Sequence, residues 1–189
     1  MILFFLLLTG FAASQDVCQA KVDSGTAKCS NASSLRFFHD HDTKRCLAFQ
    51  FSGCGGNGNN FESVALCRQR CIPMDHITCP ANTPATLNNK GTNNCGKGTG
   101  EPVCKDSTSF CHYGPNAIGL CCSKDSKEKS HQDHSKTCSN GAEKYQFEDG
   151  GHKKVLLGKS CSHNFCPAQF KCKWETSMRT AAKYNRSFF

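Results

Sequence analysis

Cysteine is the residue type in this chain that could take part in the most kinds of chemistry, including metal binding and disulfide formation. The 189 residues include sixteen cysteines. Closely spaced cysteines bind metals in a reducing compartment and form disulfides in an oxidising one. Histidines and acids also cluster, as H-D-H-D at 39–42 and S-H-Q-D-H at 130–134, where metal binding competes with an ordinary solvated turn. We favour solvated turns, because the first cluster falls in an expected hairpin turn, and we predict no metal.

Other patterns of catalytic residues are weak. G-K-G-T-G-E at 96–101 loosely resembles a phosphate-binding loop, but it lacks the full spacing and a following helix. No pair of carboxylates and no Ser/His/Asp set stands out, and thiols beside histidines oxidise in an exported chain. We therefore predict that the protein is not an enzyme and needs no cofactor.

The N-terminus indicates export. An apolar run, M-I-L-F-F-L-L-L, precedes Ala12 and Ser14, small residues spaced as at a signal-peptide cleavage site. We place the signal peptide at 1–14, with Gln15 as the first mature residue. The run is too short to span a membrane comfortably, and no later stretch is long enough. We expect a secreted, extracellular protein without a membrane span, its cysteines paired.

The formal net charge of +8 is spread along the chain. We interpret it as a solvated basic surface, with attraction to an acidic matrix polysaccharide as the alternative. Nucleic acid is not an expected partner of an exported chain.

The cysteines fall into three clusters, which predict three modules, at 15–72, 79–122 and 137–175. Each is too small to fold on a hydrophobic core alone and needs disulfides, each worth about 3–4 kcal/mol. Residues 123–136 contain no apolar side chain, so we expect a flexible polar linker there, and a flexible tail at 176–189.

The second and third modules have similar cysteine spacings. The second ends in Cys121-Cys122, and the matching pair of the third would fall near Ala182-Lys183, where T-A-A-K-Y stands instead. The third copy therefore lacks a pair or pairs its four cysteines differently.

Local patterns in the first module predict an α+β arrangement. R-F-F-H-D and C-L-A-F-Q-F read as two strands joined by a turn, which gives a twisted hairpin. S-V-A-L-C-R-Q-R-C reads as a short helix with Ser63 as its N-cap. Cys67 and Cys71 are four residues apart, so they share one helical face that can be bridged to the sheet.

The first module resembles the Kunitz-type (pancreatic trypsin inhibitor) domain. The likeness rests on F-Q-F-S-G-C, the following G-G-N-G-N-N-F, Cys67 and the order of the six cysteines between 18 and 71. It implies a small disulfide-rich fold, a twisted β-hairpin followed by a C-terminal helix, in which Asn59 is the buried asparagine that hydrogen-bonds to the backbone. It also implies three disulfides: Cys18–Cys71, Cys29–Cys54 and Cys46–Cys67.

The resemblance implies a function as well. Kunitz proteins inhibit serine proteases as rigid substrates, and the residue after the second cysteine enters the primary specificity pocket of the protease. By this likeness the reactive bond joins Ser30 to Asn31, and Phe51, Ser52 and Gly53 form a second contact edge. Because Ser30 is small and uncharged, elastase-like or chymotrypsin-like proteases are favoured over trypsin-like ones.

The loop departs from the family pattern in several ways. Ten residues separate Cys18 from Cys29, where the family has eight, and one extra residue precedes Arg36. Asn31 lies in a glycosylation sequon beside the reactive bond, and Asn185 lies in a second sequon. Ser52 stands where a glycine is common in the family. These departures leave a non-inhibitory binding or extracellular-matrix protein as the alternative function.

The last two modules, with C-P at Cys79 and G-L-C-C at 119–122, resemble lustrin-type cysteine-rich repeats. Kunitz domains occur beside such repeats in secreted proteins. The expected architecture is thus a Kunitz fold followed by two loop-rich cysteine modules.

Overall fold

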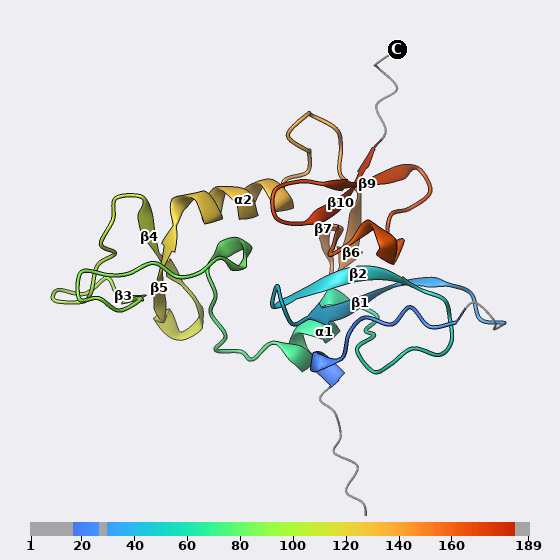
Figure 1. Cartoon of the computed structure of the whole chain (residues 1–189), viewed down its shortest axis with the longest axis horizontal. Coiled ribbons are helices and arrows are strands. Elements are labelled where there is room, and N and C mark those ends of the chain that lie inside the picture. Colours follow the sequence, from blue (N-terminus) through green and yellow to red (C-terminus); the bar gives the residue numbers. More distant parts are fainter. Residues whose placement is uncertain (1–16, 27–29, 184–189) are drawn as a thin grey trace, which may run out of the picture.

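The computed structural model describes residues 17–26 and 30–183 (Figure 1). The helices are α1 (Val64–Cys71) and α2 (Lys124–His134). Short 3-10 turns are η1 (Val17–Gln19), η2 (Pro80–Asn82), η3 (Pro115–Ala117) and η4 (Cys161–His163). The strands are β1 (Ser34–Asp40), β2 (Arg45–Phe51), β3 (Asn94–Cys95), β4 (Ser109–Tyr113), β5 (Gly119–Ser123), β6 (Gln146–Asp149), β7 (His152–Val155), β8 (Leu157–Gly158), β9 (Phe170–Trp174) and β10 (Arg179–Lys183). The expected signal peptide at 1–14 and the sequon at Asn185 lie outside the described residues.

The first module is the expected hairpin and helix. β1 and β2 are antiparallel, with Ser34 opposite Phe51 and Asp40 opposite Arg45. The helix α1 starts after Ser63, whose hydroxyl accepts a hydrogen bond from the backbone N–H of Leu66 at 3.0 Å. That bond satisfies one of the free amide groups of the first turn.

The disulfides Cys18–Cys71 and Cys46–Cys67 tie this helix to the N-terminal segment and to the sheet. They match the pairing that the family resemblance implies. Cys54 is also disulfide-bonded, and its expected partner Cys29 lies outside the described residues.

The second module is a small sheet held by three disulfides. Its strand order is β3-β5-β4, so the strand that comes last in the chain lies in the middle. The disulfides are Cys79–Cys122, Cys95–Cys111 and Cys104–Cys121. In Figure 1 this module forms the left end of the molecule.

The third module repeats that topology and extends to Lys183, beyond its expected end at residue 175. Its sheet has the order β8-β10-β9, again with the last strand in the middle. Ala181 lies opposite Cys172, as Cys121 lies opposite Cys111 in the second module. Ala181-Ala182 therefore occupy the positions of the Cys121-Cys122 doublet, one residue earlier than the sequence suggests.

The predicted flexible tail from residue 176 is wrong for its first half. Residues 179–183 form β10, the central strand of the C-terminal sheet (β8, β9 and β10). Met178, Thr180 and Ala181 are almost completely buried. The short T-A-A-K sequence does not predict a strand, because its apolar residues are small and only partly alternate with polar ones.

Two cysteines of the third module are unpaired, which corrects the expectation that all cysteines are bridged. Cys161 pairs with Cys172, whereas Cys138 and Cys166 are free among the described residues. The topology explains why, since the residues that would bridge them are alanines. Cys138 packs with Ala182, and Cys166 lies against the buried cluster that contains Ala181.

Replacing Ala182 by cysteine should complete one missing bridge. We expect Ala182→Cys to pair with Cys138, so that titration of the unfolded protein finds one thiol per chain instead of two, with a gain of about 2–4 kcal/mol in unfolding free energy. Ala65→Cys, on the exposed side of α1, is the control and should leave three thiols. Three thiols in Ala182→Cys would contradict the proposed equivalence of the two modules.

The segment predicted to be a flexible linker is instead the helix α2. Ser123 is its N-cap and accepts from the backbone N–H of Ser126 at 3.1 Å, and Lys129 pairs with Asp125 one turn away at 2.7 Å. At the other end, the buried Lys144 donates to the carbonyl of Gln132 at 2.5 Å. Burial lowers the pKa of Lys144.

One buried carboxylate anchors α2 to the third module. Asp133 has no exposed surface and accepts hydrogen bonds from the hydroxyl groups of Thr176 and Ser177. Polar contacts with distant residues therefore hold a helix that has no apolar face.

The Kunitz hairpin and the C-terminal sheet share one hydrophobic core. Phe37, Ala48 and Cys67 form a buried cluster with three residues of the third module: Leu156, Phe165 and Ala181. A second cluster joins Phe38, Leu47 and Phe49 to Met178. The third module lies on the hairpin in Figure 1, so the first and third modules are one packed unit.

Candidate functional site

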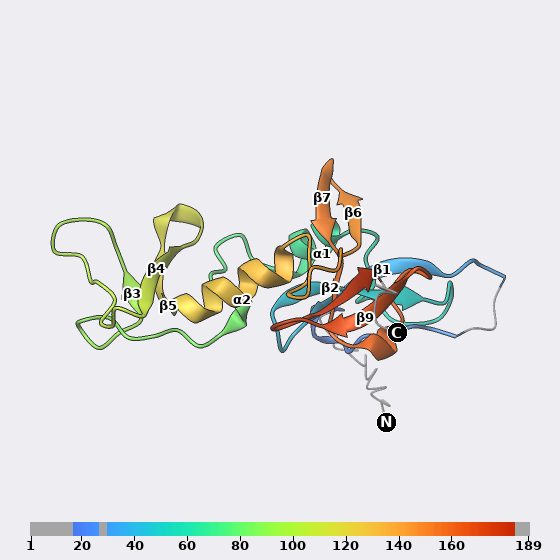
Figure 2. The ribbon, with the colours of Figure 1, turned by 90° about the horizontal axis from the view of Figure 1, so that it is seen from above.

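The predicted reactive segment is exposed. The side chains of Ser30, Asn31, Ala32 and Ser33 are all solvent-exposed. Both ribbon views place the start of β1 at the end of the molecule opposite the second module (Figures 1 and 2). The added modules therefore leave this end of the hairpin open to a large partner.

The segment contacts the expected second edge directly. The Asn31 side-chain amide donates to the carbonyl oxygen of Gly53 at 3.2 Å. Gly53 has φ of +105°, and a Cβ built on it would lie 2.6 Å from the carbonyl oxygen of Asn31. Only glycine fits both the backbone conformation and this approach.

An irregular segment, residues 24–26, also holds the edge through hydrogen bonds. Ser52 donates through its backbone N–H and its hydroxyl to the carbonyl of Ser24, at 2.9 and 2.7 Å. The backbone N–H of Thr26 donates to the carbonyl of Cys54 at 3.0 Å. Ser52 thus helps to fix the longer segment that precedes Cys29, a role that the sequence did not reveal.

The close contact between Gly53 and Asn31 can be tested by comparing alanine substitutions at Gly53 and at a glycine that has no close neighbours. We expect Gly53→Ala to lower the unfolding free energy by about 1–2 kcal/mol, because alanine disfavours this backbone conformation. The clash of the new Cβ with Asn31 should add a further loss. Gly91→Ala is matched, because Gly91 has φ of +80° and nothing within 4 Å of a built Cβ. Equal losses of unfolding free energy in the two variants would show that the loop and the edge are not in tight contact.

The scaffold beneath the site contains a buried asparagine, in the place that the resemblance gives it. Asn59 is fully buried, accepts from the backbone N–H of His39 at 2.8 Å and donates to the carbonyls of Ala20 and His39 at 2.7 and 2.9 Å. One amide thus joins the N-terminal segment to β1, and its two bonds to His39 satisfy buried polar groups.

The two predicted contact segments are uncharged. The exposed segment 30–33 and the edge 51–53 contain no ionisable side chain. The two free thiols lie in the third module, where burial raises the pKa of Cys166 to about 11 and also raises the pKa of Cys138. Both are protonated at neutral pH and so are poor nucleophiles.

The acidic cluster at 39–42 holds an ammonium group. Lys159 Nζ lies 2.6 Å from carboxylate oxygens of both Asp40 and Asp42. The hydrogen bond to Asp40 raises the pKa of Lys159, and the hydrogen bond from Lys159 lowers the pKa of the Asp42 carboxyl. These carboxylates therefore join the hairpin turn to the third module.

Comparison with known proteins agrees with this geometry. The model of the Kunitz/Bovine pancreatic trypsin inhibitor domain matches residues 17–72. The BPTI/Kunitz inhibitor domain-containing protein C02F12.5 of Caenorhabditis elegans is 32% identical over 180 residues, which cover 92% of this chain and 97% of that protein. The chain belongs to the BPTI/Kunitz inhibitor domain family.

Further relatives match the whole chain or the first module. Major allergen Ani s 1 of Anisakis simplex is 29% identical over 164 residues, or 85% of this chain and 84% of that protein. Kunitz-type serine protease inhibitor bitisilin-1 of Bitis gabonica is 40% identical over 57 residues, 30% of this chain and 60% of its own. The family match and the inhibitor bitisilin-1 support a protease-inhibitor role for the Kunitz module, and members of this family are generally inhibitors rather than enzymes.

Of the helices in the described part of the chain, none is long and apolar enough to cross a membrane.

Proposed function

We propose that this protein is a secreted inhibitor of an extracellular serine protease, which it blocks with the loop after Cys29. The observation that carries the proposal is the contact between Asn31 and Gly53, which fixes the exposed segment against its neighbouring edge. A loop that is ordered before binding loses little entropy when a protease takes it up.

Attack would occur at the bond between Ser30 and Asn31. After cleavage, the disulfide Cys18–Cys71 still links the two parts of the module covalently, and the side-chain bond from Asn31 to Gly53 holds the new amine near its former partner. Religation then competes with release, because the reacting groups stay close together. The protein acts as a slowly turned-over substrate.

Ser30 defines the class of target. Its short neutral side chain suits the small primary pocket of elastase-like enzymes, and next the hydrophobic pocket of chymotrypsin-like ones. The aspartate in the trypsin pocket would find no cation. We therefore propose an elastase-like or chymotrypsin-like target.

The sequon at Asn31 supports a second candidate function. A glycan on the Asn31 amide would stand beside the reactive bond and obstruct a protease. In that form the Kunitz module would serve as a binding scaffold, in the extracellular matrix or elsewhere.

A titration separates these two functions. The full-length protein is titrated against elastase-, chymotrypsin- and trypsin-like enzymes, alongside Ser33→Ala, which removes the sequon without changing Asn31. We expect inhibition of the first class at concentrations below about 1 μM, equal to or stronger in Ser33→Ala. Absence of inhibition by both forms would refute the inhibitor function.

We also propose that residues 79–122 and the third module are lustrin-type repeats. The shared strand order and the matched positions of Cys121 and Ala181 support a common origin of the two modules. In the third copy, packing on the Kunitz hairpin stabilises the module in place of the two missing disulfides.

A further inference from the structure

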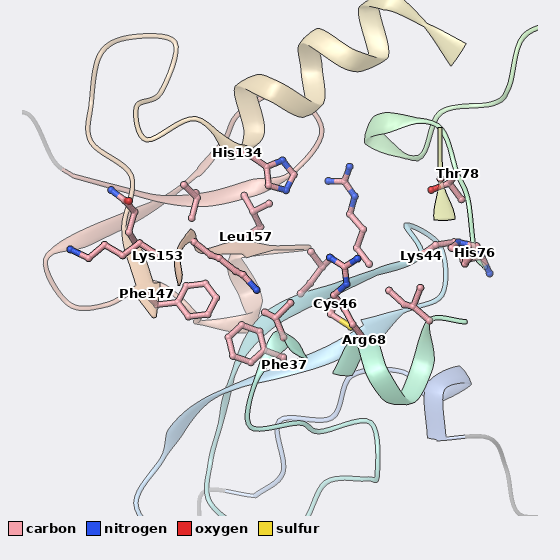
Figure 3. A pocket seen from close by; sticks show the side chains of 18 of the residues that line it. Phe37, Lys44, Cys46, Arg68, His76, Thr78, His134, Phe147, Lys153 and Leu157 are labelled. Atoms are coloured by element: carbon pink, nitrogen blue, oxygen red, sulfur yellow. The ribbon is translucent and has the colours of Figure 1, made fainter. Parts of the chain in front are cut away.

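The three modules enclose a cavity of about 630 Å³ on the side of the hairpin away from the reactive segment. Its walls come from β2, α1, the chain that leads into the second module, the end of α2, and the β6–β7 hairpin (Figure 3). The volume is typical of sites for small organic ligands.

The cavity is strongly basic. Its lining contains six lysines and arginines and three histidines, and no acidic residue among the described residues that form it. The basic lining residues are Lys44, Arg45, Arg68, Lys136, Lys153, Lys154, His76, His112 and His134. Lys154 pairs with Asp149, but the described part of the chain has no ion pair for Arg45, Arg68, Lys136 or Lys153. Uncompensated charge of one sign in a cavity attracts an ion of the other sign.

Arg45 lacks a hydrogen-bond acceptor for its buried guanidinium group. Its Nη1 is buried and has no hydrogen-bond partner, and the same is true of Nε2 of His76. Burial lowers the pKa of Arg45. The carboxylate of Asp133 exerts an opposing charge on it, but that carboxylate already accepts bonds from Thr176 and Ser177. A buried guanidinium nitrogen without an acceptor costs free energy that a bound anion would recover.

The cavity also has an apolar surface. Phe37 and Phe147 stack with their ring centres 5.3 Å apart, and Val155 and Leu157 continue the surface. Figure 3 shows Phe147 with Lys153 beside it on one side of the cavity, Phe37 and Leu157 between, and Lys44 and His76 on the other side. The site therefore combines an apolar surface with cationic groups around it.

We propose that this cavity binds a small amphiphilic anion, one acidic head group joined to an apolar body. The head, a carboxylate, phosphate or sulfate, accepts hydrogen bonds from Arg45 and its cationic neighbours, and the body lies against Phe37 and Phe147. Charge-assisted bonds to a guanidinium fix the head, and burial of the apolar body adds affinity. This site is distinct from the reactive loop, and the proposal holds whether or not the loop inhibits a protease.

Calorimetric titration of the full-length protein tests the proposal. The probes are decanoate and dodecyl phosphate below their micelle concentrations, dodecanol, inorganic phosphate, and a sulfated heparin-type oligosaccharide. We expect one saturable site for at least one of the two amphiphilic anions, and the stronger of the two identifies the head group. We expect binding at least tenfold weaker for dodecanol and for inorganic phosphate. Equal binding of dodecanol, or saturable binding of the oligosaccharide alone, would overturn the proposal.

Charge-removing variants locate the site. Arg45→Met keeps the apolar stem and should weaken binding of the better anion at least tenfold. Lys105→Met removes an exposed charge in the second module that does not line the cavity, and should change affinity less than twofold. If Arg45→Met fails to fold, Lys153→Met on the exposed rim should weaken binding severalfold. Unchanged affinity in the folded cavity variants would overturn the proposal.

Discussion

Ser30→Lys should turn the protein into a trypsin inhibitor. An ammonium group in the primary pocket would meet the aspartate that trypsin places there. A buried, hydrogen-bonded charge pair of this kind changes binding by about 2–5 kcal/mol, which is roughly 30- to several-thousandfold in affinity. The measurement is the inhibition constant against trypsin for the variant and for the unchanged protein.

Ser33→Lys is the matched control, and all three proteins are compared without the Asn31 glycan, because Ser33→Lys also removes the sequon. It adds the same charge to the same exposed segment, three residues further on, and it should leave trypsin inhibition within about threefold of the unchanged protein. Equal gains in the two variants would mean that net charge attracts trypsin and that residue 30 does not enter the pocket. If neither variant inhibits trypsin, the scaffold does not present its loop as a substrate.

Phe165→Ala should cause the largest loss of stability. Phe165 is 2% exposed and lies in the cluster shared by the hairpin and the C-terminal sheet. Gly158 leaves the space for its ring, because a Cβ on Gly158 would lie 2.3 Å from it. Removal of such a ring costs about 3–5 kcal/mol.

Denaturant unfolding of the oxidised protein measures this loss. Leu66→Ala, at a side chain that is 48% exposed, should change the unfolding free energy by less than about 0.5 kcal/mol. A single transition that shifts as a whole in Phe165→Ala supports one shared core. Separate transitions for the first and third modules, with that of the first module unchanged, would show that these two modules fold independently.

The Kunitz module was predictable from its sequence because its signals are local. Alternating apolar residues predicted the hairpin, and Ser63 before V-A-L-C predicted the start of α1, where the structure has it. The pairs Cys18–Cys71 and Cys46–Cys67 needed the family resemblance, because spacing alone does not choose among fifteen pairings.

The rest of the chain depends on distant contacts that local patterns do not report. The helix α2 has no apolar residue and is anchored through the buried Asp133, so its composition suggested a linker. The strand β10 contains small residues that do not mark a strand in the sequence. Only its pairing opposite Cys172 shows that Ala181 is the counterpart of Cys121. The basic cavity arises where three modules meet, so no single segment could predict it.

The reactive bond is predicted by the family resemblance, and the structure adds how the neighbouring edge is held. The resemblance predicts Ser30 and Asn31 as the point of attack and marks Ser52 and the longer segment before Cys29 as departures from the family pattern. The hydrogen bonds from Ser52 to Ser24 show a different role, since that segment is tied to the edge.

Identification of the first bond cut by an elastase-like enzyme tests the central claim most directly. The protein is incubated with a small amount of the enzyme, and the products are analysed by mass spectrometry before and after reduction. We predict slow gain of a single water, two fragments on reduction with Asn31 as the new N-terminus, and partial religation when enzyme is added to the cut form. A first cut at any other bond, or rapid degradation of the whole module, would contradict the assignment of Ser30 and Asn31 as the reactive bond.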